Sequence, residues 1–312
     1  MNEFAVDVRN LSVQFGSFYA VNDISFRVSP GEIFGFLGAN GAGKTTTIRV
    51  LCGLLKPTAG QAIVCGKEVS NNETFVKTNV GYMSQKFTLY NDLTVQENLD
   101  FIASLRNMEQ TLYLERRKEL FDFISFDRPL KTNVHDLPGG IKQQVSLVAS
   151  LLHNPEIIFL DEPTAGVSPA SRNIFWQLIH KIAAQGKTVF VTTHYMDEAE
   201  QCGRIALMRD GKIIALNSPE QLKVDTFTTS LYEFDPIHKM NFKNISDLSH
   251  EGIFSFFEPY GLKFHASFKS ESIKKSNFDR LNAQFNIRKI SPSLEDVFIK
   301  SVETRPTEVQ IK

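Results

Sequence analysis

Residues 38–45 constrain the fold more than any other part of this 312-residue chain. They match the pattern GxxxxGK[ST], with an apolar run at 32–37 before them and a helical pattern at 46–55 after them. Glycines let the backbone wrap so that successive N–H groups face phosphate oxygens, and the following helix adds the positive end of its dipole. The pattern predicts a nucleotide phosphate site. The residues expected to bind the phosphates are Gly38, Ala39, Asn40, Gly41, Ala42, Gly43, Lys44 and Thr45.

Two carboxylates follow a second apolar run. Residues 157–160 are all apolar, and Asp161 and Glu162 come directly after them. Both carboxylates are therefore expected at the C-terminal end of a buried strand, where ligands bind in open parallel sheets. We expect Asp161 to hold Mg²⁺ and Glu162 to polarise the water that attacks the γ-phosphate. Lys44 is expected to reach the β- and γ-phosphates and the Thr45 hydroxyl to ligate Mg²⁺, so the expected cofactors are ATP and Mg²⁺.

Two further polar residues lie near expected strand ends. His194 follows the apolar strand at 188–192, and its neighbours favour a nucleotide-sensing role over that of a structural or exposed histidine. Gln85 lies where the strand-rich part of the chain gives way to a helical part, and its amide can contact Mg²⁺ or water while it follows a moving subdomain. The predicted catalytic residues are Glu162, His194 and Gln85, and the predicted metal ligands are Thr45, Gln85 and Asp161.

The periodicity of apolar residues divides the chain into parts. Residues 4–15 and 20–28 alternate apolar and polar positions as strands do, and residues 85–137 have helical periodicity. Strand and helix alternate again after residue 157, which predicts a mostly parallel sheet with flanking helices. Residues 224–305 lack these motifs and are expected to form a small separate α+β domain.

Charge and composition limit the expected partners. The formal net charge of -1 gives no reason to expect nucleic acid. The three cysteines have no CxxC spacing, which fits a reducing cytosolic compartment and argues against a disulfide frame or a zinc site. No stretch approaches the ~20 apolar residues that cross a bilayer. A membrane role is therefore expected to come through a separate partner chain.

Taken in chain order, the motifs resemble those of ABC transporter nucleotide-binding subunits. Within that family they are most similar to the ATP-binding subunits of bacterial ABC-2 type, drug-efflux-like exporters. The resemblance covers residues 4–220, and residues 292–298 resemble the C-terminal motif of these exporters. The matching motifs are the phosphate loop, Gln85, a signature-like segment at 137–144 with the sequence LPGGIKQQ, the carboxylates Asp161 and Glu162, and His194.

The resemblance implies an α/β fold, that of a P-loop NTPase ABC cassette. Such a cassette has a mostly parallel core sheet, an antiparallel β subdomain and a helical subdomain. In this chain it implies a nucleotide-binding domain at 1–222, with the helical subdomain at about 86–140. A small C-terminal α+β appendage at 223–305 and a tail at 306–312 follow.

The resemblance also assigns contacts to single residues. It implies that Phe15 stacks on the adenine ring and that Thr46 touches the α-phosphate. It implies that a membrane permease docks against the helical subdomain, which would hold the chain peripherally at the cytoplasmic face of the inner membrane. Phe87, Leu89 and Tyr90 either line that docking groove or belong to the core of the helical subdomain.

The signature segment departs from the family pattern. In the family, two subunits enclose two ATP molecules, and the signature Leu-Ser-Gly-Gly-Gln of each completes the site of the other. Here the serine position is Pro138, which lacks the hydroxyl and the backbone N–H, and the closing glutamine is Ile141. The aspartate of the following loop is Ser168, and the arginine of the signature helix is Gln144.

These departures leave two interpretations of the dimer. The residues that act on the chain's own ATP are intact, whereas those lent to the neighbour, Pro138, Gly139 and Gly140, are altered in part. One hypothesis is an asymmetric heterodimer with a better-equipped second ATP-binding subunit. The other is a homodimer in which Leu-Pro-x-Gly is a tolerated variant.

The predicted function is that of an ATP-binding and hydrolysing exporter subunit, in which ATP-driven dimer closure is coupled to transport by a separate permease. One alternative is a regulatory, catalytically poor subunit, which Pro138 and Ser168 favour and the intact Glu162 opposes. Another is a non-transport ABC ATPase, such as a translation or DNA-repair factor. The single phosphate loop, the lack of a long heptad run and the near-zero net charge argue against that class.

Overall fold

The computed structural model describes residues 3–85, 89–238, 248, 252–270 and 275–303. The chain forms two compact units, of which the first ends at Leu216 and the second begins at Asn217. The sequence placed this boundary between residues 222 and 223.

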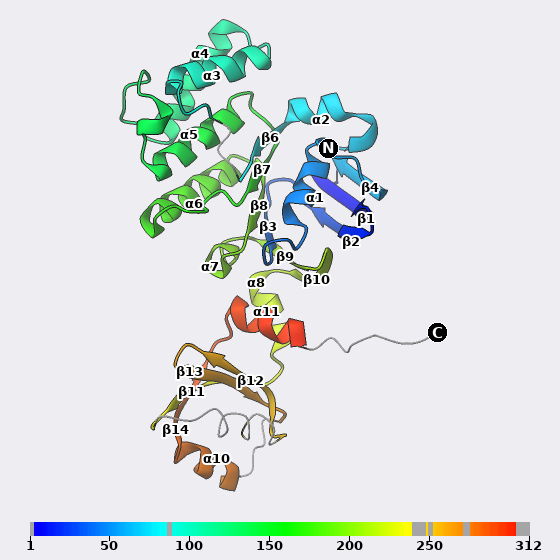
Figure 1. Ribbon diagram of the computed structural model, residues 1–312, viewed down its shortest axis with the longest axis vertical. Coiled ribbons are helices and arrows are strands. Elements are labelled where there is room, and N and C mark those ends of the chain that lie inside the picture. The colour runs from blue at the N-terminus through cyan, green and yellow to red at the C-terminus, as the bar shows by residue number, and fades with distance from the viewer. Residues whose placement is uncertain (1–2, 86–88, 239–247, 249–251, 271–274, 304–312) are drawn as a thin grey trace. The chain divides into compact units, whose positions relative to one another are not determined.

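The first unit is built on a six-stranded sheet in the order β10-β9-β3-β8-β7-β6 (Figure 1). The pairs β3–β8, β3–β9, β6–β7 and β7–β8 are parallel, which confirms the predicted mostly parallel sheet. The carboxyl ends of parallel strands meet at one edge of a sheet, so residues that follow these strands are brought together there. The strands are β3 (Ile33–Leu37), β6 (Val80–Met83), β7 (Ile157–Asp161), β8 (Thr188–Thr193), β9 (Arg204–Arg209) and β10 (Lys212–Asn217).

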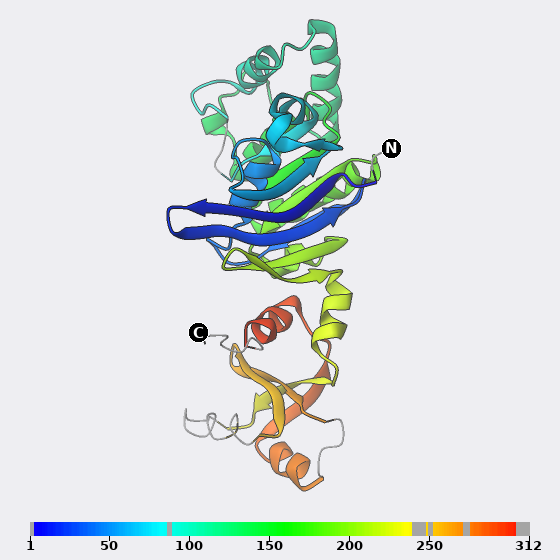
Figure 2. The ribbon, with the colours of Figure 1, turned by 90° about the vertical axis from the view of Figure 1, so that its right-hand side faces the viewer.

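A second sheet of four strands is antiparallel and has the order β2-β1-β4-β5. Figure 2 shows β1 and β2 running side by side as a long hairpin, in which Phe15 pairs with Phe18 across the turn. Buried and more exposed positions alternate from Leu11 to Gln14 in β1 and from Ile24 to Val28 in β2, and these parts match the period-two pattern of the sequence. The strands are β1 (Val6–Phe15), β2 (Phe18–Val28), β4 (Ala59–Val64) and β5 (Lys67–Glu68).

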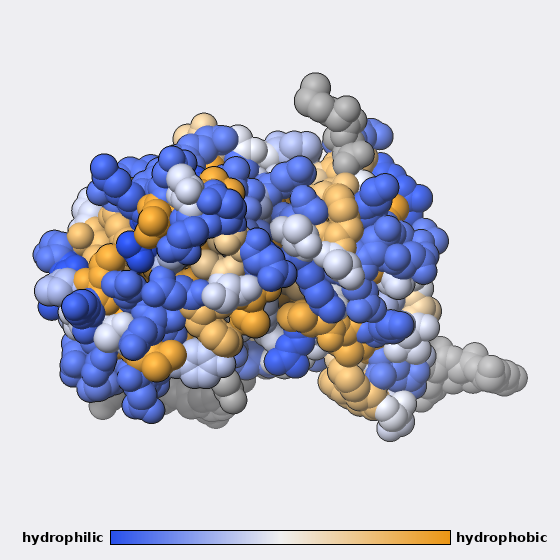
Figure 3. All heavy atoms as spheres, turned by 90° about the horizontal axis from the view of Figure 1, so that it is seen from above, coloured by the Kyte–Doolittle hydropathy of each residue, from blue (hydrophilic) through white to orange (hydrophobic). Residues whose placement is uncertain are grey.

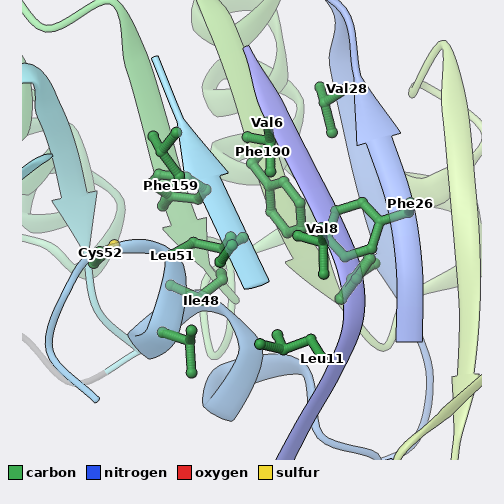
Figure 4. Packing of buried hydrophobic residues seen from close by; sticks show 14 of the residues in the cluster. Val6, Val8, Leu11, Phe26, Val28, Ile48, Leu51, Cys52, Phe159 and Phe190 are labelled. Atoms are coloured by element: carbon green, nitrogen blue, oxygen red, sulfur yellow. The ribbon is translucent and has the colours of Figure 1, made fainter. Parts of the chain in front are cut away.

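A phenylalanine-rich core joins the two sheets and fixes helix α1 (Lys44–Leu51) between them (Figure 4). The ring of Phe190 lies 4.9 Å from that of Phe36, and the ring of Phe26 lies 5.0 Å from Phe36, both edge to face. Ile48 and Leu51 of α1 are fully buried in the same cluster. The helix that follows the phosphate loop is therefore held by apolar packing along its length.

The remaining helices of the first unit flank the parallel sheet. Figure 1 shows α3, α4 and α5 grouped on the side of β6, and α5 packs against that strand. Thr94 and Glu97 form a capping box that fixes the start of α3. The helices are α2 (Glu73–Asn79), α3 (Val95–Leu105), α4 (Gln110–Phe123), α5 (Gly139–Leu151), α6 (Pro169–Ala184) and α7 (Met196–Ala199), with short 3-10 turns at Val69–Asn71 and Val134–Asp136.

The second unit is an antiparallel sheet with helices, which is the α+β arrangement expected of the appendage. Its strand order is β12-β13-β11-β14, and one face buries a second phenylalanine cluster that includes Phe234, Phe254 and Phe285. Its elements are α8 (Pro219–Thr226), β11 (Leu231–Pro236), β12 (Phe254–Tyr260), β13 (Lys263–Phe268), α10 (Lys275–Asn282), β14 (Phe285–Ile290) and α11 (Leu294–Glu303).

The segment 292–298 forms the start of α11 and ties that helix to the sheet. The Ser293 hydroxyl accepts a hydrogen bond from the Asp296 N–H at 3.2 Å. A carboxylate oxygen of Asp296 lies 2.7 Å from Nδ1 of His265 on β13, and both side chains are buried. The resemblance of 292–298 to an exporter motif therefore coincides with a structural anchor of the second unit.

His153, just after α5, couples the stability of the first unit to pH. Its Nε2 lies 2.9 Å from the Val80 carbonyl oxygen. Burial is the main cause that lowers the pKa of His153 from 6.5 to about 4, and the nearby charges of Arg106, Lys187 and Arg116 add to it. Between these two values the unfolded chain binds a proton that the folded chain does not, so stability rises with pH in this window.

We expect His153→Gln to flatten that dependence. As the pH falls from 7 to 4, the wild-type chain should lose at most about 3 kcal/mol of unfolding free energy through this histidine. The measurement is urea unfolding at a series of pH values, followed by the fluorescence of Trp176, the one tryptophan of the chain. Trp176 is buried in α6 and reports on the first unit. An unchanged difference between pH 7 and pH 4 in the variant would contradict the assignment.

Candidate nucleotide-binding site

The phosphate loop connects β3 to α1, as the sequence predicts. A Cβ on Gly43 would lie 2.4 Å from the Ala20 carbonyl oxygen, and the φ of Gly43 is +107°. A Cβ on Gly38 would lie 2.3 Å from the Met208 carbonyl oxygen. Only glycine fits at these two positions, and the loop can therefore close tightly over the N-terminus of α1.

Lys44 is folded back over the loop. Its ammonium donates hydrogen bonds to the carbonyl oxygens of Gly38 at 2.7 Å and Ala39 at 3.1 Å. The same nitrogen lies 3.4 Å from Oε1 of Glu162, and only 3% of the lysine is exposed. A cation in this position stands at the place where the loop would receive the phosphates.

The loop opens onto a cleft of about 480 Å³. The cleft brings together most of the predicted nucleotide-binding residues with Gln85 and Glu162. The other three predicted residues do not line it. Gly38 and Ala39 accept hydrogen bonds from Lys44, and Ala42 is a buried residue of the loop. The lining residues are Phe15, Phe18, Ala20, Asn40, Gly41, Gly43, Lys44, Thr45, Thr46, Gln85 and Glu162.

Two aromatic rings stand at this cleft. Phe15 and Phe18 end and begin the two strands of the β1–β2 hairpin, and their exposed fractions are 54% and 62%. Large exposed rings beside a nucleotide phosphate site suit a stacking contact with a base. The sequence singled out Phe15 alone. The turn at Gly16 and Ser17 is the signal that places Phe18 opposite it.

Asp161, at the end of β7, contacts Thr45 at the end of the phosphate loop. Its Oδ1 accepts hydrogen bonds from the hydroxyls of Thr192 at 2.7 Å and Thr45 at 3.0 Å. Its Oδ2 is buried and has no hydrogen-bond partner among the described residues. Burial is the largest cause that raises the pKa of Asp161 above its ordinary value. A buried carboxylate oxygen without a partner, next to a hydroxyl, is a donor set of hard oxygens that fits Mg²⁺.

Glu162 is the point on which the predicted catalytic residues converge. Its Oε2 accepts a hydrogen bond from Nε2 of Gln85 at 3.0 Å and lies 3.2 Å from Nδ1 of His194. Only 6% of Glu162 is exposed. Lys44 also lies beside this carboxylate, so three residues from three other chain segments meet at Glu162. One of them is Gln85, which the sequence also predicts as a metal ligand.

The backbone at Glu162 is unusual. Its φ is +48°, in the left-handed region that a residue with a Cβ seldom occupies. The Glu162 N–H donates to the carbonyl oxygen of Thr192 at 3.1 Å and to its hydroxyl at 3.0 Å, which holds the turn in place. Strained backbone of this kind concentrates at functional sites and costs on the order of 1–3 kcal/mol.

The signature segment lies outside the cleft lining. Pro138 and Gly139 are exposed, whereas Leu137 is buried, so the start of α5 presents its first turn to the surroundings. Pro138 is the N-cap residue of α5 and provides no side-chain hydrogen bond to the helix. A Cβ on Gly140 would lie 2.4 Å from the Ser171 hydroxyl oxygen, so the starts of α5 and α6 are in close contact.

Ser168 caps the second of these helices. Its hydroxyl accepts a hydrogen bond from the Ser171 N–H at 3.3 Å, and the residue is exposed. Ser168 therefore caps α6 at the loop position where the family pattern has an aspartate.

A groove on the helical part contains one of the predicted docking residues. Leu89 is buried in the core, and Phe87 lies outside the described residues. Tyr90 is 55% exposed and stacks edge to face on Phe101 at 5.4 Å. Both rings line a groove of about 280 Å³ between α3, α5 and β6, together with Tyr82, Asn98, Ile102, Leu105, Arg106, Ser146, Ala149 and Ser150.

The fold and the cleft define a P-loop nucleotide-binding cassette. A parallel sheet carries a phosphate loop at the start of a buried helix, and an acidic pair lies at the end of β7, on the far side of β8, at the same edge. Comparison with known proteins extends this assignment. The family model described as "ABC transporter" matches residues 21–165.

Curated relatives and solved structures agree with the family model. The probable multidrug ABC transporter ATP-binding protein YbhF of Escherichia coli is 44% identical over 227 residues, which are 72% of this chain but 39% of that protein. The Nod factor export ATP-binding protein I of Rhizobium leguminosarum bv. viciae is 31% identical over 96% of this chain and 95% of its own. The dimeric ATP-binding cassette MJ0796, solved with ADP and Pi, is 25% identical with a TM-score of 0.62, over 68% of this chain and 98% of that chain.

The chain belongs to the ABC transporter family, as an ATP-binding cassette protein. Relatives of this kind are ATPases, and MJ0796 was solved in a post-hydrolysis state. Among the described residues, no helix combines the length and the apolar character needed to span a membrane.

We expect Asp161→Asn to abolish the gain in ATP affinity that Mg²⁺ provides. The amide keeps the shape of the side chain and removes the charge, so affinity in EDTA should stay near the wild-type value. With Mg²⁺ the variant should bind ATP at least about tenfold more weakly than the wild type. Titration with a fluorescent ATP analogue measures both. Glu162→Gln is the matched control and should keep the Mg²⁺ gain. An equal gain in Asp161→Asn and the wild type would exclude this metal assignment.

Proposed function

We propose that the chain is the ATP-binding and hydrolysing subunit of a bacterial ABC-2 type exporter. The observation that carries this proposal is the convergence of Lys44, Gln85 and His194 on the buried carboxylate of Glu162. The names of the relatives, a multidrug transporter protein and an export protein, support the exporter class.

In the proposed reaction, Glu162 acts as the general base. The loop N–H groups and Lys44 hold the phosphates, and Mg²⁺ held by Thr45 and Asp161 would supply positive charge to offset that of the phosphates. We expect the γ-phosphate to replace Glu162 as the partner of Lys44, because the phosphate carries more negative charge. The carboxylate then accepts a proton from the attacking water, while Gln85 and His194 orient that water. The water oxygen bonds to the γ-phosphorus as the bond from that phosphorus to the bridging oxygen breaks, and ADP and phosphate leave. Phe15 and Thr46 are proposed to contact the adenine ring and the α-phosphate.

The groove beside α3 is the proposed docking site for a permease. Its rim carries Tyr90, Phe101 and Leu105, of which Leu105 is 67% exposed. Figure 3 shows apolar side chains among hydrophilic ones on the face of the first unit that carries α3 and α4. An amphipathic helix that lays its apolar face into such a groove fits this surface. The permease would hold the chain at the cytoplasmic face of the inner membrane.

A second ATP-binding subunit is the other proposed partner. The first turn of α5, with Pro138 and Gly139, is exposed, and we propose that it contacts a nucleotide bound by another chain. The free N–H groups at a helix start favour an anion, but Pro138 contributes neither a hydroxyl nor an N–H. A heterodimer with unequal sites and a homodimer are both compatible with this surface.

We expect Glu162→Gln to separate catalysis from binding. If Glu162 is the base, turnover should fall at least about a hundredfold, while ATP affinity stays within a few-fold of the wild type. Steady-state phosphate release and titration with a fluorescent ATP analogue measure the two quantities. A regulatory, catalytically poor subunit would instead show equally low turnover with and without the substitution.

We expect Pro138→Ser to reveal whether the chain needs a different partner. If the unequal-partner hypothesis is right, the purified chain alone is slow, and the restored donor raises its ATPase rate by up to about a hundredfold. Pro30→Ser, in an exposed turn before β3, is the control and should change nothing. Full activity of the wild-type chain alone, unaffected by Pro138→Ser, would favour the homodimer.

A further inference from the structure

Glu198 on α7 is a buried carboxylate that does not line the nucleotide cleft. Its exposed fraction is 0%, although it lies only four residues after His194. A carboxylate without solvent is unfavourable unless other groups of the protein compensate its charge and its hydrogen-bonding capacity. The groups that compensate the Glu198 carboxylate therefore show which parts of the chain it connects.

Three partners from three elements compensate Glu198. Its Oε2 accepts a hydrogen bond from the hydroxyl of Thr193, at the end of β8, at 2.6 Å. Its Oε1 accepts one from the hydroxyl of Thr164, in the loop after β7, and lies 3.2 Å from Nε of Arg172 on α6. The Glu198 carboxylate thus links three parts of the chain, which are the loop after β7, the loop after β8, and helix α6.

These contacts fix the residues immediately before and after His194 in the sequence. The Thr193 hydroxyl that donates to Glu198 also accepts a hydrogen bond from the Tyr195 N–H at 3.0 Å. The guanidinium of Arg172 lies 3.9 Å from the centre of the Tyr195 ring. Both neighbours of His194 are therefore fixed through the Glu198–Arg172 pair, and the imidazole is directed towards Glu162 at 3.2 Å.

The same pair holds the other loop. Thr164 lies two residues after Glu162, and the Ala165 N–H donates to the Glu162 carbonyl oxygen at 3.1 Å, so the turn that carries Glu162 ends at the Thr164 contact. The main-chain N–H of Arg172 donates to the carbonyl oxygen of Ser168 at 2.9 Å, so Arg172 lies in the first turn of α6.

We propose that Glu198 is a positioning residue that sets the geometry between His194 and Glu162 by joining the loops after β7 and β8. It does not line the nucleotide cleft. This inference rests on the proposed roles of Glu162 and His194. It adds a residue outside the cleft that fixes the positions of their side chains. A carboxylate that only stabilised the fold would act on catalysis independently of His194.

A double-mutant cycle distinguishes these two roles. Glu198→Gln keeps the shape and one acceptor oxygen, but it replaces the other oxygen with an amide donor and removes the charge opposite Arg172. We expect kcat to fall about tenfold, with ATP affinity unchanged, because the reacting groups are misaligned and the phosphate loop is not. In a His194→Ala background, Glu198→Gln should cause less than about a twofold further loss, because the group it positions is already absent.

Two further variants keep the test decisive. Thr164→Val removes one hydroxyl donor and leaves the ion pair, so it serves if Glu198→Gln does not fold, and its smaller loss should likewise vanish in the His194→Ala background. Asp197→Asn is the matched control, because Asp197 lies 3.4 Å from the same arginine but is 70% exposed, and it should stay within twofold of the wild type. Folding is checked by Trp176 fluorescence.

ATPase activity is measured on the full-length chain with the subunits that co-purify with it. Equal losses in both backgrounds, or an unchanged kcat in Glu198→Gln, would overturn the inference. A His194→Ala variant with full activity would instead refute the proposed role of His194. If turnover is too low to measure, hydrogen exchange of the Tyr195 amide decides, since Glu198→Gln should accelerate it by about tenfold. Unchanged protection of that amide would then contradict the inference.

Discussion

The parallel pairing of β3, β8 and β7 is the constraint on which the site depends. Leu37 pairs with Thr193, and Thr192 pairs with Asp161, so three strands end at the same level of the sheet. The phosphate loop, the acidic pair and His194 each follow one of these ends. A slip of one residue in either pairing would turn the side chains to the opposite face and separate the loop from the carboxylates. The phenylalanine core between the sheets stabilises this alignment.

Charge balance explains why so many polar groups can be buried at one edge. Lys44 lies within 3.4 Å of Glu162, and Asp161 has two hydroxyl donors. The cation and the carboxylate compensate each other without nucleotide, while one oxygen of Asp161 keeps no partner among the described residues. The proposed Mg²⁺ would lie beside Asp161, and a bound phosphate would replace Glu162 as the partner of Lys44.

The sequence was sufficient where a functional residue follows a strand or a glycine pattern. The phosphate loop, Asp161 and His194 occupy the strand ends predicted from apolar runs, and the fold class is confirmed. The sequence was insufficient where function depends on side chains that meet across the fold. The contact of Thr164 with Glu198 joins residues 34 positions apart, and no local pattern indicates it. No motif indicates Phe18. Only the hairpin turn at Gly16 and Ser17, across which Phe18 pairs with Phe15, indicates that its ring lies at the cleft.

The left-handed backbone at Glu162 has a consequence for inactive forms of this protein. Glycine occupies that conformation without cost, whereas glutamate is held there by its surroundings. Substitution by glycine would remove the carboxylate and at the same time relieve the strain, so the loss of contacts is partly offset. A chain with glycine at this position would therefore keep its fold while it lacked the proposed base, so loss of activity would not entail loss of the protein.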